Sequence, residues 1–181
     1  MMLDDYIQTS ELEAHACALL KERGVELESI AEVVYDLQKD YIDDLSMEEC
    51  MDNLKAVMRK REVQYAVITG IEIDMIADKK LFSPILNKIL LRDEGLYGID
   101  EILILSIVNV YGSIGLTNFG YVDKLKPGII GVLNSSKDER CNTFIDDVVG
   151  ALAAAAASRI AHAQPAKFEK KFQEELKAQQ R

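Results

Sequence analysis

The chain has 181 residues, of which 49% are hydrophobic and 29% charged, and its formal net charge at pH 7 is -10. These values exclude a largely disordered chain and predict a single domain over residues 1–181 with a core of its own. The negative charge argues against nucleic acid and anionic membranes as general partners. It stays compatible with a phosphorylated substrate if a metal ion or a nearby cation offsets the repulsion.

The three cysteines, Cys17, Cys50 and Cys141, are widely spaced and form no CxxC pair. Zinc-site spacing is therefore absent, and the thiols are expected to be reduced, as in the cytosol. The first residues show neither the basic nor the apolar region of a signal peptide. We therefore predict a cytoplasmic protein.

Apolar residues recur at helical spacing through the first half of the chain. A capping box at residues 10–13 opens the first predicted helix, which Gly24 ends. Another capping box begins at Ser46, and Ser83 followed by Pro84 starts the last helix of this half. The predicted helices are 10–24, 27–41, 46–58, 62–79 and 84–92.

A long segment, residues 102–122, contains no charged residue and is long enough to cross a membrane. It also contains polar residues such as Asn109 and Asn118 and three glycines. An isolated helix in lipid tolerates such polar content poorly. We therefore predict no transmembrane span, but a central buried helix of about residues 100–118 surrounded by the other helices.

The chain after this segment breaks at Lys126, Pro127 and Gly128. Residues 129–133 are too few to be classified as helix or strand. A last core helix follows with five consecutive alanines, 153–157, and is predicted to end at Pro165. Beyond it, Phe168, Phe172 and Leu176 give an amphipathic tail that docks on the domain or on a second subunit. Since no convincing strand pattern appears, the predicted fold is an all-α, single-domain helical bundle.

Nucleophilic and phosphate-binding motifs are missing from the sequence, since it has no GxSxG, no P-loop and no GxGxxG after a strand. The two histidines, His15 and His162, lie near opposite ends of the chain and are predicted to be surface or packing residues. Carboxylates therefore remain as the main candidates for chemistry.

Five acidic residues border sequence that is predicted to be buried: Asp100, Glu101, Asp123, Asp146 and Asp147. Each of them caps a helix, pairs with a basic side chain or binds a cation such as Mg²⁺. Composition alone favours Asp100 and Asp146 as helix caps and Asp123 as a solvated helix end. Adjacent helical residues diverge by about 100°, so one of Asp146 and Asp147 would be the direct ligand and the other would orient it. Asp74 and Asp78, one turn apart, are a weaker metal candidate.

Two short motifs resemble the phosphatidylglycerophosphatase A family. The stretch Phe119-Gly120-Tyr121-Val122-Asp123-Lys124-Leu125-Lys126-Pro127 is similar to the family's F-x-x-x-D-x-x-K-P element, and Ile145-Asp146-Asp147-Val148-Val149 is similar to its D-D helix start. Gly98-Ile99-Asp100-Glu101 resembles the family's earlier W-D-E element in its Asp-Glu pair. Over most of its length the chain resembles the soluble branch of YutG-like, or low-temperature-requirement C, proteins.

The resemblance implies Mg²⁺-dependent removal of a phosphate from phosphatidylglycerol phosphate or a related phosphoester. It nominates Asp100, Glu101, Asp123 and Asp146 as metal ligands, and Asp123, Lys126 and Asp147 as catalytic residues. The expected partners are a phosphorylated small molecule or lipid head group, with peripheral membrane contact, and a second copy in a homo-oligomer. The sequence departs from the family in lacking a P-G-T element near the N-terminus and in having Gly120 where the family has arginine.

A second function remains open at this point. The chain would then be a non-catalytic helical oligomer that responds to stress or low temperature and binds partners through exposed apolar surfaces. The arrangement of the carboxylates in space separates the two hypotheses, because only a phosphatase requires them to converge on one cavity.

Overall fold

The computed structural model describes residues 6–136 and 140–179, with side chains described up to residue 165. Helices form throughout these ranges and strands do not, which confirms the predicted all-α, single-domain fold. The helices are α1 (Thr9–Glu22), α2 (Leu27–Gln38), α3 (Met47–Met58), α4 (Arg61–Asp78), α5 (Pro84–Arg92), α6 (Ile99–Val108), the 3-10 turn η2 (Asn109–Tyr111), α7 (Gly112–Leu125), α8 (Ile129–Ser135) and α9 (Ile145–Gln179).

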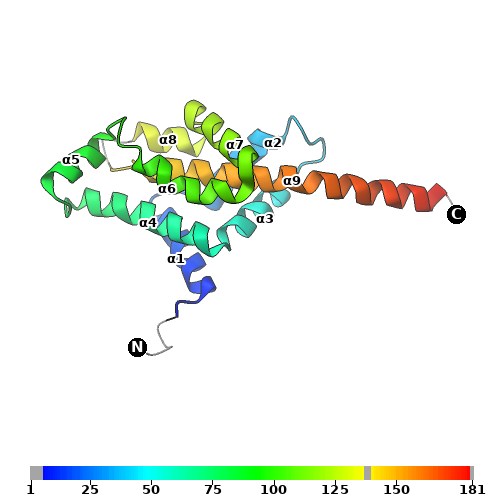
Figure 1. Ribbon diagram of the computed structural model, residues 1–181, viewed down its shortest axis with the longest axis horizontal. Coiled ribbons are helices and arrows are strands. Elements are labelled where there is room, and N and C mark those ends of the chain that lie inside the picture. Colours follow the sequence, from blue (N-terminus) through cyan, green and yellow to red (C-terminus); the bar gives the residue numbers. More distant parts are fainter. Residues whose placement is uncertain (1–5, 137–139, 180–181) are drawn as a thin grey trace.

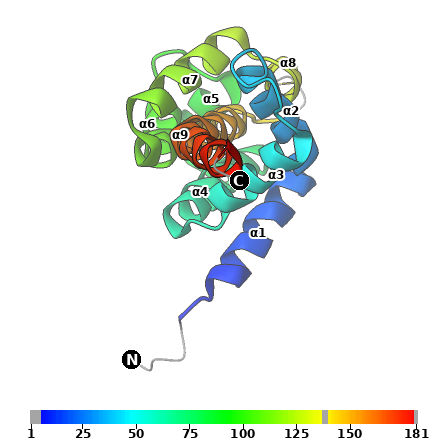
Figure 2. The same ribbon diagram turned by 90° about the vertical axis from the view of Figure 1, so that its right-hand side faces the viewer.

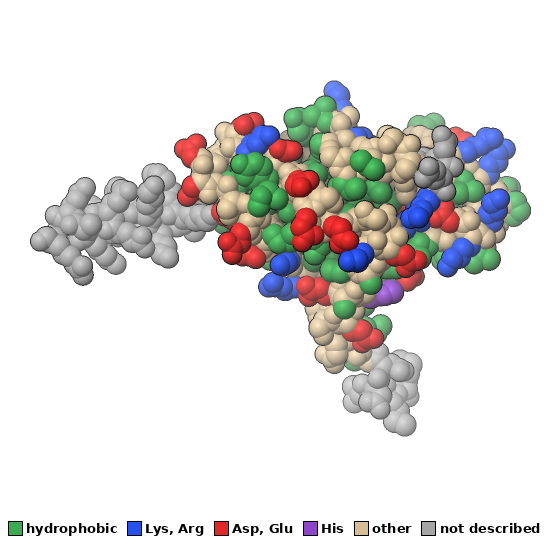
Figure 3. All heavy atoms as spheres, turned by 180° about the vertical axis from the view of Figure 1, so that it is seen from behind, with side chains coloured by type: hydrophobic (Ala, Val, Ile, Leu, Met, Phe, Trp, Pro, Cys, Tyr) green, Lys and Arg blue, Asp and Glu red, His purple; other side chains and the backbone are tan. Residues whose placement is uncertain are grey.

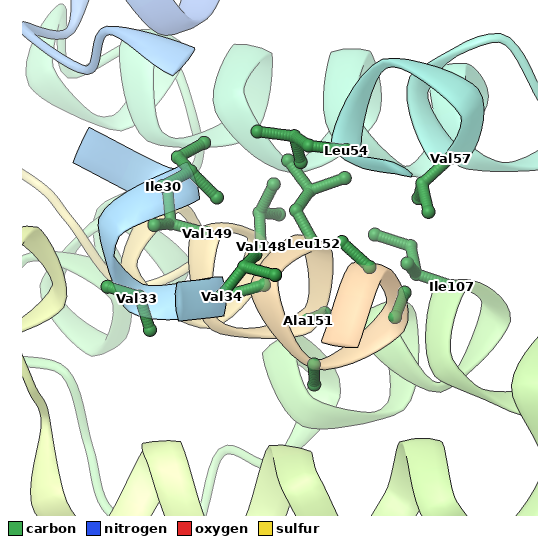
Figure 4. Close-up of a cluster of buried hydrophobic side chains, with 14 of the residues drawn as sticks. Ile30, Val33, Val34, Leu54, Val57, Ile107, Val148, Val149, Ala151 and Leu152 are labelled. Carbon is green, nitrogen blue, oxygen red and sulfur yellow. The ribbon is translucent and has the colours of Figure 1, made fainter. Parts of the chain in front are cut away.

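The centre of the bundle is α9, which packs against α2, α3, α4, α6, α7 and α8 (Figures 1 and 2). Its run of five consecutive alanines, 153–157, is completely buried. Because alanine has a small side chain, neighbouring helices can approach α9 closely from several sides. On the preceding turns, Val148, Val149 and Leu152 meet apolar side chains of α2 and α3 (Figure 4).

The predicted central helix at residues 100–118 is wrong, since α9 takes that place and the uncharged segment lies at the side of the bundle. The segment is broken into α6 and α7 by the turn η2. The stretch Ile99–Leu125 is long and apolar enough to cross a membrane, with a mean hydropathy of 1.6, yet only 33% of its most apolar window is buried. As two helices of 10 and 14 residues, neither half reaches the roughly 20 residues of a spanning helix.

The helix caps follow the sequence in part. Ser46 and Ser83 accept hydrogen bonds from the backbone N–H groups of Glu49 and Leu86, as predicted. The capping box at residues 10–13 is wrong, because α1 begins at Thr9 after Gln8, which makes no side-chain cap. Residues 129–135 form the helix α8.

Helix α9 does not end at Pro165, as the sequence predicts, but continues through it to Gln179. Its second half extends beyond the rest of the bundle (Figure 1). The side chains of Phe168, Phe172 and Leu176 lie outside the described residues, so their docking stays a prediction.

Candidate functional site

The beginnings of α6 and α9 and the end of α7 meet at a polar pocket of about 170 Å³. The structure brings together all six residues that the sequence nominated for this site, because each of them lines the pocket: Asp100, Glu101, Asp123, Lys126, Asp146 and Asp147. A larger cavity of about 520 Å³ lies between the α2–α3 loop, α7 and α9 and contains none of them. The smaller pocket therefore holds the candidate chemistry.

The side chain of Lys126 lies among three carboxylates. Its Nζ donates to Oδ1 of Asp123 at 2.7 Å, to Oδ2 of Asp146 at 3.2 Å and to Oδ1 of Asp147 at 3.4 Å. These acceptors come from two helices, α7 and α9, so one cation ties the end of α7 to the beginning of α9. The same cation is available for a phosphate group that enters the pocket.

Lys126 has an unusual backbone conformation for a lysine. It terminates α7 with φ 46° and ψ 54°, in the left-handed region where glycine is the usual residue. The following Pro127 and Gly128 prevent α7 from continuing. A strained backbone that carries a charged side chain is typical of functional sites, and here it accompanies the ammonium group at the centre of the carboxylates.

Burial and crowding perturb the proton affinity of this cluster. Burial and the neighbouring Asp146 raise the pKa of Asp147 to about 8, although Lys126 opposes the shift. Burial disfavours the charge of Lys126, but the attraction of Asp146 and the hydrogen bond to Asp123 outweigh it and raise the pKa of the ammonium. The pocket thus holds an excess of negative charge around a firmly protonated lysine.

Asp100 and Glu101 occupy the first turn of α6 on the other side of the pocket. Asp100 is buried, and its Oδ1 accepts a hydrogen bond from the backbone N–H of Glu101 at 2.9 Å. Burial is the main cause that raises the pKa of Asp100, with Asp93 and Glu101 adding to it. Glu101 itself is exposed at the pocket's edge.

The N-terminus of α9 is capped from a distant helix. Asp74 of α4 is completely buried and accepts hydrogen bonds from the backbone N–H groups of Phe144 and Ile145 at 3.1 and 2.9 Å. Burial raises its pKa to about 7 despite these bonds. Asp74 thus accepts from the backbone N–H groups at the start of α9, and Asp146 and Asp147 are left to face Lys126. Asp146 also accepts a hydrogen bond from the backbone N–H of Asp147.

Asp78 anchors the same loop from the end of α4. It pairs with Nη1 of Arg23 and accepts from the backbone N–H of Cys141, both at 2.6 Å. Arg23 also donates to the carbonyl of Cys141 and to the side chain of Asn142. The weaker metal candidate of the sequence, Asp74 with Asp78, is thus occupied in holding the loop that leads into α9. No local sequence signal links these residues, because the partners of Asp74 and Asp78 lie between 55 and 71 positions away.

The donor set of the pocket fits Mg²⁺ in kind, since the ion prefers carboxylate oxygens and retains several waters. Among the described residues, however, no group of three or more Asp, Glu, His or Cys side chains is already arranged to hold a metal ion. The ammonium of Lys126 lies within hydrogen-bond distance of the carboxylates of Asp123, Asp146 and Asp147. A divalent ion beside them would offset the same excess negative charge.

Comparisons with known proteins agree with the motifs. A sequence profile described as phosphatidylglycerophosphatase A matches residues 16–162. YutG of Bacillus subtilis is 56% identical over 155 residues, which cover 86% of this chain and 93% of YutG. The YpjQ protein of the same organism is 54% identical over 158 residues, covering 87% of this chain and 89% of YpjQ.

Solved structures show the same fold. The low temperature requirement C protein of Listeria monocytogenes is 55% identical with a TM-score of 0.84, covering 87% of this chain and 99% of its own. A protein from Bacillus stearothermophilus is 59% identical with a TM-score of 0.81, covering 83% and 94%. The predicted resemblance is therefore confirmed, both to the family and to its YutG-like, low-temperature-requirement C members.

Proposed function

The chain belongs to the phosphatidylglycerophosphatase A family, and we propose that it is a Mg²⁺-dependent phosphatase. The substrate would be a phosphate monoester, either phosphatidylglycerol phosphate or a related phosphoester of phospholipid metabolism. One observation carries the proposal: the carboxylates of Asp123, Asp146 and Asp147 converge on the ammonium of Lys126 inside one small pocket. Family membership alone supports a phosphatase-like activity in general terms.

The chain's own side chains supply binding and proton transfer. Lys126 would contact the phosphate and offset the negative charge that spreads over its oxygens in the transition state. Asp123, which is the most exposed of the three carboxylates around Lys126, would hold and orient the attacking water. Asp147 would take part in proton transfer from within the pocket.

The proposed ligands of Mg²⁺ are Asp100, Glu101, Asp123 and Asp146, which line the pocket from three helices. The bound ion supplies Lewis-acid stabilisation of charge on the phosphoryl group. In this arrangement the Asp123 carboxylate would be shared between the ion and Lys126.

The size of the pocket bears on the substrate. At about 170 Å³ it holds a phosphate group and its immediate neighbours but not two acyl chains. A lipid substrate would therefore present only its head group, with the chains outside the protein. We propose that the enzyme works in the cytoplasm and reaches such a lipid peripherally; a soluble phosphoester satisfies the same pocket chemistry.

A phosphate-release screen tests the proposal. The purified full chain is given phosphatidylglycerol phosphate in detergent, and a panel of soluble phosphomonoesters, each with Mg²⁺, with Mn²⁺ and with EDTA. The proposal expects at least one substrate to release phosphate only in the presence of metal. Absence of release from every substrate under both metals would favour the non-catalytic oligomer, an alternative linked to low temperature through the name of the Listeria relative.

A further inference from the structure

The exposed residues of α6, η2 and α7 between Ile102 and Tyr121 carry no charge, and large apolar side chains are interspersed among them with small polar ones such as Ser106 and Thr117. Six large apolar side chains on it are between 37% and 64% exposed: Ile102, Leu105, Val110, Ile114, Leu116 and Tyr121. No Asp, Glu, Lys or Arg occurs between Ile102 and Val122. We call this surface, from Ile102 to Tyr121, the α6–α7 face.

The core does not require this surface to be apolar. Helices α6 and α7 pack against α9 (Figure 2). Their buried residues include Ile104, Ile107 and Phe119. A helix at the side of a monomeric bundle normally turns a charged side to water. The molecule seen from behind does so, with acidic and basic side chains spread over it (Figure 3).

The area of the α6–α7 face can be estimated from the lengths of its helices. Helices of 10 and 14 residues are about 15 and 21 Å long and about 10 Å wide, which gives roughly 350 Å² of projected surface. The largest apolar patch on a typical monomeric protein is about 300–600 Å² and is often functional, and this face falls within that range. We infer that the α6–α7 face binds the same face of a second copy of this chain, forming a two-fold symmetric dimer.

Charge favours a second copy as the occupant. With a net charge of -10, two copies repel each other over most of their surfaces. An uncharged surface is the place where they can meet without bringing like charges together. In a symmetric dimer the same patch serves both copies, so a neutral face is complementary to itself.

The polar residues of the face favour protein over lipid as the partner. The exposed amide of Asn109 needs hydrogen-bond partners that the hydrocarbon of a bilayer lacks and a second copy supplies. The hydroxyls of Ser106 and Thr117 already donate to backbone carbonyls of their own helices and can be buried without loss. Glu101 and Asp123, at the two ends of the segment, also oppose an anionic lipid surface.

A groove continues the face along α7. It is the cavity of about 520 Å³ that is lined by Ile114 and Tyr121 of α7, by Gln164 of α9, and by the end of α2 and the following loop, where Asp36 and Asp40 contribute carboxylates. Nε2 of Gln164 is buried and has no hydrogen-bond partner among the described residues. A side chain from the second copy can enter this groove and accept that hydrogen bond.

Molar mass in solution tests the inference, by sedimentation equilibrium over a range of concentrations. The wild-type chain, of 20.3 kDa, is expected at twice its mass, whereas Ile114→Glu and the milder Leu105→Ser are expected to raise the dimer dissociation constant at least tenfold. Leu96→Glu and Ile85→Glu are matched controls, since both residues are exposed apolar side chains outside the face. These controls should remain dimeric, and circular dichroism should show unchanged helix content in all variants.

Two results would overturn the inference. One is a wild-type monomer at every concentration, and the other is a dimer that persists in both face variants. A monomer that floats with neutral phosphatidylcholine vesicles, and loses flotation in Ile114→Glu, would assign the face to a bilayer instead. None of these outcomes depends on phosphatase activity, so the dimer and the proposed function can fail separately.

Discussion

The carboxylate of Asp74 on α4 accepts a 2.9 Å hydrogen bond from the backbone N–H of Ile145, the first residue of α9. This bond joins residues that are 71 positions apart and caps the central helix from outside. Because the cap comes from Asp74, the acidic residues in the first turn of α9 are directed to the pocket. The site is thus positioned by α4, although α4 contributes no residue to the pocket's lining.

Replacing Asp74 with alanine should destabilise the protein. The backbone N–H groups of Phe144 and Ile145 would lose their acceptor in a fully buried place, which costs about 2–3 kcal/mol. Urea unfolding followed by circular dichroism measures the loss. Asp52→Ala, an exposed aspartate on α3, is the control and should change the free energy of unfolding by less than about 0.5 kcal/mol; an equal loss in both variants would refute the cap.

Removing the cation at Lys126 should expose the repulsion among its carboxylate neighbours. Lys126→Met is expected to lose about 2 kcal/mol of stability at pH 8, a value reduced because the side chain is 24% exposed. The loss should shrink at pH 5, where the carboxylates take up protons, and Mg²⁺ should restore part of it. Lys124→Met removes an exposed lysine two residues away and should show neither effect in thermal melts.

The raised pKa of Asp147 makes stability depend on pH. Its folded value of about 8 lies above the unfolded value of about 3.9, so the folded state holds a proton that the unfolded state has released between these pH values. Stability therefore falls as pH rises from about 4 to about 8. Asp147→Asn has no such proton. Between pH 5 and pH 8 in EDTA, the Tm of the wild type should therefore fall by at least 3 °C more than the Tm of Asp147→Asn. Parallel curves of Tm against pH would contradict the pKa shift.

Two glycines of α7 should respond differently to alanine. A Cβ at Gly115 would lie 2.6 Å from the backbone carbonyl oxygen of Val108, so the turn between α6 and α7 would have to shift. We expect Gly115→Ala to cost about 2 kcal/mol. A Cβ at Gly120 meets nothing within 4 Å, and Gly120→Ala should gain about 0.5–1 kcal/mol from helix propensity. Urea unfolding measures the free energy of unfolding of both variants. Equal changes in the two variants would contradict this prediction.

Periodicity and short motifs are local signals; they predicted the helices and identified the six site residues, but they left open whether these residues meet in space. It did not predict which helix is central. A uniformly apolar segment has the same sequence pattern whether it forms one helix or two, so the pattern did not indicate the break at Asn109–Tyr111. The burial of residues 153–157 on all sides depends on neighbours that periodicity cannot identify.

The sequence identified the residues of the site, but not the distant contacts that hold them in place. Asp123, Lys126, Asp146 and Asp147 are recognised from motifs, whereas the role of Asp74 as a cap depends on a contact between distant segments. The left-handed backbone of Lys126 was equally hidden, since glycine is the residue that normally signals this conformation. Long-range contacts and strain are therefore the parts that required the structure.

The central claim is that the carboxylates around Lys126 form a Mg²⁺-dependent phosphatase site, and phosphate release by Asp123→Asn tests it most directly. Asp123 is part-exposed at the pocket, so the amide should leave helix content and Tm close to those of the wild type. The account predicts phosphate release by the wild type with Mg²⁺, none with EDTA, and a rate at least about 100-fold lower in Asp123→Asn. Full activity in Asp123→Asn, or wild-type activity that is unchanged by EDTA, would contradict it.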